Sequence, residues 1–141
     1  MLDLNTEFGH FASKYIESEY FIWLTTVDAT GTPQPKPVWF IWEAGSFLIF
    51  SQPQAYKLKH ILKNPNVSLH FNTVDAKGGG PLIVFTGRAI VDLDCPPAHQ
   101  VRAYLQKYEN GIATLDSTPE RFGATFSTAL RIRPTKVRGW E

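Results

Sequence analysis

Three lysines and a serine have the residue types and the spacing that bind a phosphate group. Ser51 ends a predicted strand, Lys57 and Lys59 follow in a short predicted helix, and Lys36 lies one strand away. A helix start has free backbone N–H groups and the positive end of the helix dipole, so an anion is stabilised there. The ammonium and hydroxyl groups add further donors. This pattern predicts a site for an anion such as a phosphate monoester.

Spacing alone leaves a second interpretation open. Lysines on a helix lie more often on a solvated face than in a binding site. Lys57 and Lys59 therefore also fit a helix surface that binds nothing.

Other catalytic and metal-binding patterns are missing from the sequence. The four histidines have neither the i, i+4 spacing nor the two-residue spacing of a metal site, so we expect structural or surface roles for them. No serine lies in the strand–turn–helix context of a hydrolase nucleophile. The residues concerned are His10, His60, His70 and His99, and Ser51, Ser68 and Ser127.

Six β-strands are predicted to position the anion site. They are rich in β-branched and aromatic residues, or alternate apolar with polar positions as residues 67–73 do. The predicted strands are residues 20–28, 37–43, 47–51, 67–73, 81–94 and 129–137. Strands in meander order without long crossovers favour a closed or nearly closed antiparallel barrel. A barrel of this size has no large internal cavity, so a sizeable ligand must lie outside it or between two subunits.

Four helices are predicted between or before these strands. An apolar stripe over residues 8–16 predicts the first helix, with Asn5 or Thr6 as its N-cap. The second has Pro53 in its first turn, places Ala55, Leu58, Ile61 and Leu62 on one face, and stops at Asn64-Pro65. The third contains Val101, Tyr104, Leu105 and Tyr108 and ends at Asn110-Gly111. The fourth opens at Thr118-Pro119. The fold class is therefore mainly β, with inserted helices.

Composition limits the classes of protein to consider. The 141 residues fit one domain, residues 1–141, and the formal net charge of +1 gives no field for nucleic acid or an anionic membrane. No apolar run approaches the length of a membrane span or resembles a secretory signal. The single cysteine, Cys95, cannot form an internal disulfide, which favours a reducing compartment. We expect a cytoplasmic protein with no nucleic-acid or membrane partner.

Four motifs in order give the sequence a family resemblance. They are Val38-Trp39-Phe40, Ile49-Phe50-Ser51, Lys57-x-x-His60-Ile61 and Asn64-Pro65-x-Val67-x-Leu69. Together they resemble the pyridoxamine 5′-phosphate oxidase-like, FMN-binding split-barrel superfamily, and most closely its small single-domain, deazaflavin-dependent members. The resemblance covers most of residues 8–95 and is weak in the last third of the chain.

The resemblance implies a set of cofactor-binding residues. Lys36 stands at the head of a strand whose Pro37, Val38 and Trp39 would run along the isoalloxazine ring. Phe50, Ser51 and Gln52 would lie at the ribityl and phosphate end, and Tyr56 and Lys57 at the phosphate. Gly79 and Gly80, in a loop of three glycines, would approach the cofactor from the partner subunit.

Two departures from the family pattern are visible. Tyr56 stands where pyridoxamine phosphate oxidases have an arginine, so one charge-assisted phosphate contact is missing. Residues 136–141 lack the arginine and histidine pattern with which those oxidases bind their substrate, so oxidation of vitamin B6 is not expected.

The resemblance implies a homodimeric oxidoreductase that binds FMN, or the deazaflavin coenzyme F420, at the subunit interface and transfers hydride to or from a small molecule. No side chain is assigned a catalytic role, because the cofactor carries the redox chemistry. The aromatic residues Trp23, Trp39, Trp42 and Trp140 would partly cover the interface. Two alternatives remain open: a non-catalytic flavin, haem or tetrapyrrole carrier, and a structural protein that has lost its cofactor.

Overall fold

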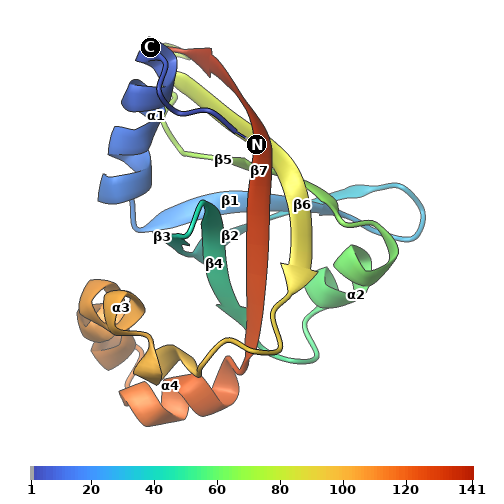
Figure 1. Cartoon of the computed structure of the whole chain (residues 1–141), viewed down its shortest axis with the longest axis vertical. Helices are drawn as coiled ribbons and strands as arrows, with labels where there is room; N and C mark the ends of the chain where they lie inside the picture. Colours follow the sequence, from blue (N-terminus) through green and yellow to red (C-terminus); the bar gives the residue numbers. More distant parts are fainter. Residues whose placement is uncertain (1) are drawn as a thin grey trace.

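A computed structural model describes residues 2–141 of the chain. The elements in this part run in the order α1 (Glu7–Ser18), β1 (Phe21–Val27), β2 (Pro33–Trp39), β3 (Ile41–Glu43), β4 (Ser46–Ser51), α2 (Tyr56–Lys63), β5 (Asn66–His70), β6 (Leu82–Val91), the 3-10 turn η1 (Ala98–Gln100), α3 (Arg102–Thr114), α4 (Pro119–Thr125) and β7 (Thr128–Trp140). Figure 1 shows a strongly curled sheet with α1 at one end and α3 and α4 at the other.

The strands form one antiparallel sheet in the order β2-β1-β5-β6-β7-β4-β3. Three neighbouring pairs are hairpins, but β1 also pairs with β5, and β4 pairs with β7. The order is therefore not the simple meander that the sequence suggested. The two edge strands, β2 and β3, are consecutive in the chain and are separated only by Phe40. The sheet thus curls until its edges meet, which confirms a mainly β, antiparallel split barrel.

Phe40 explains why the sheet has seven strands and not the predicted six. The single strand expected over residues 37–43 is interrupted at this residue. The Phe40 N–H donates to the Tyr108 hydroxyl oxygen at 2.8 Å, and the Phe40 carbonyl accepts from Lys107 Nζ at 2.9 Å. Side chains of α3 therefore take the place of a neighbouring strand at this junction.

Two apolar cores lie on opposite sides of β4, all six residues of which are buried. Phe47 and Ile49 point into the barrel, where they belong to the same cluster as Leu69 and Phe85. Leu48 and Phe50 alternate with them and pack against the helical segment, in a cluster with Tyr104, Tyr108 and Phe122. The second core attaches α3 and α4 to the outside of the barrel.

The first helix forms as predicted, but α2 and α3 differ from the prediction at their ends. Thr6 Oγ1 caps α1 by accepting from the Gly9 N–H at 2.9 Å. The second helix begins at Tyr56, so Pro53 lies in the preceding turn. Leu62, predicted to share a face with Leu58 and Ile61, is 78% exposed, whereas those two are buried. The third helix does not end at Gly111 but continues to Thr114. Gly111 faces the Trp39 ring, where a Cβ would lie only 3.0 Å from the nearest ring atom.

The turn that connects β1 to β2 depends on one carboxylate. Asp28 Oδ1 accepts from the Thr30 N–H at 2.9 Å and the Thr32 N–H at 3.0 Å, and Oδ2 accepts from Gln34 Nε2 at 3.0 Å. Hydrogen bonds from the Thr30 side chain and the Thr32 backbone are the main cause that lowers the pKa of Asp28 to about 2. This turn fixes the start of the strand that carries Lys36.

We therefore expect an acid-dependent loosening of the β1–β2 turn. Because the pKa of Asp28 is lowered in the folded chain, its stabilisation is complete above the ordinary value of 3.8 and is lost as the pH falls through about 2. NMR shifts of the Thr30 and Thr32 amides should follow this titration. In Asp28→Asn the shifts should not titrate in this range, and a midpoint near 3.8 in the unmodified protein would contradict the assignment.

Candidate functional site

Two adjoining hollows lie between α2 and the strands β2 and β4. The polar hollow has a volume of about 480 Å³, and the aromatic hollow has a volume of about 370 Å³. Both are lined by Lys36, Gln52, Ala55 and Lys57, which form their common wall. Together they make one groove whose middle carries two positive charges.

The two lysines of the common wall come from different elements. Lys36 lies on β2 opposite Leu24 of β1, and Lys57 lies in the first turn of α2. Lys57 is half-buried and donates from Nζ to Ser51 Oγ at 3.2 Å. Burial, and then the charge of Lys36, lower the pKa of Lys57. Among the described residues no aspartate or glutamate lines either hollow, so a bound anion would relieve this repulsion.

The start of α2 adds backbone donors to the same place. Its N-cap residue, Ala55, has an extended conformation, and no side chain caps the helix. The Leu58 N–H donates to the Ala55 carbonyl oxygen, and the backbone N–H groups of Tyr56 and Lys57 remain available to a ligand.

The polar hollow contains side chains that the sequence analysis did not assign to the site. Thr26, Gln34, Gln54 and His60 line it, and Thr26 Oγ1 lies 2.8 Å from His60 Nδ1. Thr26 is buried because it occupies an inward position of β1. A buried threonine on a strand is not by itself a sign of a site.

A third hollow continues the groove along the outer side of α2. It has a volume of about 370 Å³ and shares Tyr56 and His60 with the polar hollow. Its other lining residues include Lys59 and Lys63, one turn apart on the helix, and Asp28. We call it the exit hollow. A ligand whose phosphate lay at Lys57 could extend past Tyr56 into this basic region.

The aromatic hollow is walled on its far side by α3, α4 and the residues that follow them. The lining residues from this segment are Tyr104, Leu115, Phe122 and Phe126. Trp39 forms the wall on β2, and its ring stacks on Tyr108 at a centroid distance of 4.6 Å and on Phe122 at 5.7 Å. The hollow is therefore suited to a planar, largely apolar ring.

Nine of the eleven residues predicted to bind a cofactor line this groove. Lys36, Pro37, Val38, Trp39, Phe50, Ser51, Gln52 and Lys57 line the aromatic hollow, and Tyr56 lines the polar and exit hollows. The structure therefore brings these nine residues together.

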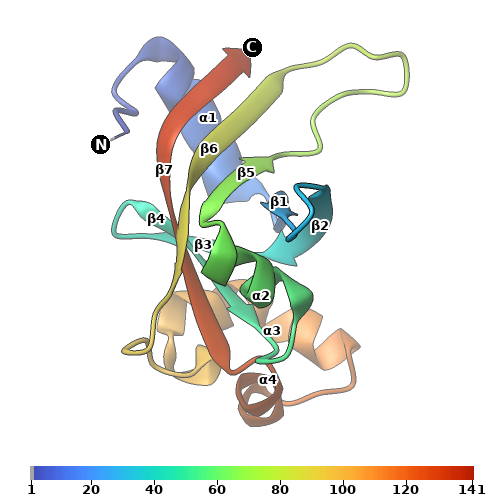
Figure 2. The ribbon, with the colours of Figure 1, turned by 90° about the vertical axis from the view of Figure 1, so that its right-hand side faces the viewer.

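The two remaining residues, Gly79 and Gly80, line neither hollow in the single chain. They belong to the loop between β5 and β6, which projects away from α2 (Figure 2). Gly80 has a φ of +102°, and its carbonyl oxygen accepts from Trp140 Nε1 at 3.3 Å. Its glycine identity thus has a local reason, and the predicted approach from a partner subunit stays a prediction.

The described residues hold no group of three or more side chains that could bind a metal ion. No helix within residues 2–141 is long and apolar enough to cross a bilayer. Cys95 is a free thiol whose pKa is raised, chiefly by burial.

Comparison with known families decides the relationship. The family model described as pyridoxamine 5′-phosphate oxidase matches residues 10–141, nearly the whole chain. The chain belongs to the pyridoxamine 5′-phosphate oxidase family. No curated protein sequence matches it.

Three solved structures of similar fold differ in what they are named for. A Listeria innocua protein named as a candidate pyridoxamine 5′-phosphate oxidase has a TM-score of 0.70 at 17% identity, over 94% of this chain and 98% of that one. A protein named F420 reductase has a TM-score of 0.63 at 22% identity, over 89% and 94%. HutZ, the haem storage protein of Vibrio cholerae, has a TM-score of 0.63 at 14% identity, over 97% and 94%. At these identities the likeness is one of fold, and proteins that share this fold are named both as enzymes and as a storage protein.

Proposed function

We propose that this family member is an oxidoreductase that binds FMN or the deazaflavin F420 in the groove along α2. The observation that carries the proposal is the common wall of the two hollows. There Lys36 and the half-buried Lys57 meet between a polar hollow and an aromatic one, with no acidic residue lining either. Both cofactors combine a phosphate with a planar ring.

Each part of the groove has a role in this proposal. Lys36, Lys57, the Ser51 hydroxyl and the N–H groups at the start of α2 hold the phosphate. Pro37, Val38 and Trp39 lie along one side of the ring. The side chains of α3, α4 and the residues that follow them exclude water from the opposite side of the ring. When bound, the cofactor accepts or donates a hydride, and the protein supplies orientation and a dry environment. The reaction partner is a small molecule.

The exit hollow bears on the choice between the two cofactors. FMN ends at its phosphate, whereas the deazaflavin continues into a longer, acidic tail. Lys59 and Lys63 lie where such a tail would leave the groove. Tyr56, which stands in place of an arginine, provides no charge-assisted contact to the phosphate of FMN. We expect both to bind, with FMN the occupant of recombinant protein and the deazaflavin a candidate for the native enzyme.

Fluorescence titration of the apo protein with each oxidised cofactor, at low and high salt, tests this function. Both should bind, and salt should weaken the deazaflavin more because its tail adds exposed charge pairs. If neither binds, the fold remains and the oxidoreductase proposal is wrong.

A non-catalytic carrier of haem or another tetrapyrrole is the second candidate, because a haem storage protein shares the fold. A haem carrier needs an axial ligand. No histidine lines the aromatic hollow, and His60 in the polar hollow is already bonded to Thr26. The absorption spectrum of the purified protein separates the candidates, since haem gives a Soret band and FMN a flavin band.

We further propose that the cofactor site is completed by a second copy of the chain. The outer face of the sheet exposes apolar side chains, among them Phe21 (39% exposed) and Trp140 (60% exposed), and Trp23 stacks on His70 there. Of the other tryptophans, Trp39 lines the aromatic hollow and Trp42 packs on the barrel core. Exposed aromatic residues are enriched at interfaces.

Light scattering of the purified protein in dilute solution should therefore give the mass of a dimer. In a dimer the glycine loop of residues 78–80 would be free to approach the partner's groove. A stable monomer that still bound FMN would refute an interfacial site.

A further inference from the structure

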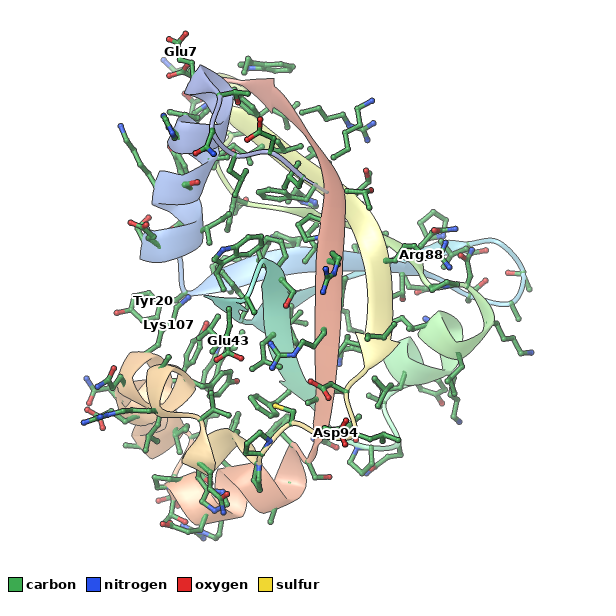
Figure 3. The ribbon with its side chains drawn as sticks, in the orientation of Figure 1. Glu7, Tyr20, Glu43, Arg88, Asp94 and Lys107 are labelled. Carbon is green, nitrogen blue, oxygen red and sulfur yellow. The ribbon has the colours of Figure 1, made fainter. Side chains whose placement is uncertain are left out.

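Lys107 of α3 lies among aromatic rings, away from the groove. Its Nζ is 3.9 Å from the centroid of the Phe40 ring, 5.3 Å from that of Tyr108 and 5.8 Å from that of Tyr20. Figure 3 shows Lys107 and Tyr20 side by side where α3 meets the start of β1. Aromatic faces attract a cation, so these three rings stabilise a positive charge on this nitrogen.

The same side chain lines a separate hollow of about 390 Å³ between α1 and β3. The other lining residues are Ser13, Ile16, Glu17, Ile41 and Trp42, none of which lines the groove. Three of them are apolar, so the hollow offers space to a small apolar group beside the Lys107 side chain.

The ammonium group of Lys107 makes one hydrogen bond within the described residues. An ammonium group has three donors, and the hydrogen bond to the Phe40 carbonyl oxygen uses one of them. The nearby acids, Glu17 in the hollow and Glu19 at the end of α1, favour a cation here and disfavour an anionic ligand.

Burial adds nucleophilic character to the amine. It lowers the pKa of Lys107 to about 8, against a smaller opposing effect of Glu19. A larger fraction of this side chain is therefore uncharged near neutral pH than for an ordinary lysine, and an uncharged amine is required for attack on a carbonyl.

We propose that Lys107 is a covalent binding site for small, uncharged, apolar aldehydes, which it takes up as an imine in the hollow between α1 and β3. The lysine nitrogen adds to the carbonyl carbon, a C=N bond replaces the C=O bond, and the carbonyl oxygen leaves as water. The protonated imine keeps the positive charge of the lysine. The three rings, the Phe40 carbonyl and the two glutamates therefore stabilise the product as they stabilise the free ammonium group.

Reductive trapping tests this site in the intact protein. Butanal with sodium cyanoborohydride converts an imine into a stable secondary amine, which peptide mass spectrometry locates. We expect early labelling at Lys107, about tenfold faster than at the exposed Lys14 of α1, because the hollow buries the alkyl chain. Formaldehyde has no chain to bury, so with formaldehyde this preference should shrink to less than threefold.

Matched variants and a competing lysine make the outcome decisive. Lys107→Arg keeps the charge and should lose the early label, whereas Lys14→Arg should retain it. Lys57 also has a lowered pKa but lies in the groove beside Lys36. Earlier labelling of Lys57 than of Lys107, or equal labelling of all lysines, would overturn the proposal. Because the readout needs no cofactor, it is independent of flavin binding.

Discussion

Lys57→Ala is expected to weaken FMN binding by roughly ten- to a hundredfold and to leave riboflavin binding almost unchanged. The substitution removes a charge-assisted contact to the phosphate, which contributes about 1.5–3 kcal/mol. Riboflavin has the same ring but no phosphate, so it does not use this contact. Fluorescence titration of both ligands against both proteins measures the difference.

Lys59→Ala is the matched control for this experiment. Lys59 lies on the same helix, but it lines only the exit hollow, where its Nζ is 5.3 Å from the centroid of the Tyr56 ring. It should change FMN affinity by less than about fivefold, since exposed charge interactions contribute less than about 1 kcal/mol. Equal losses in the two variants, or no loss in either, would show that Lys57 is not the phosphate ligand.

Tyr108→Phe is expected to lower the free energy of unfolding by about 2 kcal/mol, within a range of about 1–3 kcal/mol for an unsatisfied buried group. The Tyr108 hydroxyl accepts from the Phe40 N–H at 2.8 Å and lies 2.7 Å from the carbonyl oxygens of Phe40 and Tyr20. Phe40 is fully buried, so its N–H would lose its partner without gaining water. Urea denaturation measures the loss.

Tyr104→Phe provides the comparison within the same helix. Tyr104 is as buried as Tyr108 and packs against it, but its hydroxyl does not bond to Phe40. The loss of stability should be clearly smaller than for Tyr108→Phe. Since Trp39 stacks on Tyr108 and precedes Phe40, the near-ultraviolet circular dichroism of Tyr108→Phe should change as well. Equal stability of the two variants would contradict the assigned role.

The sequence predicted the β-strands well because most of them bury one face only. In β5, buried and partly exposed residues alternate, and this period of two is readable in the sequence, whereas β1 was predicted from its β-branched and aromatic residues. The strand count was wrong for a tertiary reason. The interruption at Phe40 depends on hydrogen bonds from Tyr108 and Lys107, 68 and 67 residues away. Nothing local to residues 37–43 indicates it.

Only the part of the candidate site that comes from residues near one another in the sequence could be predicted. Lys36, Ser51 and Lys57 come from one short stretch of the chain, from β2 to the start of α2, so their grouping at a helix start was foreseeable although the strand order was not. The other wall consists of Tyr104, Leu115, Phe122 and Phe126, from the segment between β6 and β7. In a sequence, aromatic residues on a helix indicate a core. Only the packing of α3 and α4 on β4 shows that some of them also border a hollow.

The position of β7 in the sheet determines the order in which the barrel can be completed during synthesis. It is translated after every other strand, yet it lies between β6 and β4 and pairs with both. Until β7 has been synthesised, the hairpin of β3 and β4 is not hydrogen-bonded to the four-stranded part of the sheet, β2-β1-β5-β6. During that time the apolar side chains of Phe47 and Leu48 in this hairpin lack their partners on β7, and exposed apolar side chains favour aggregation. The decisive step in the assembly of this barrel is therefore the insertion of β7 between β6 and β4.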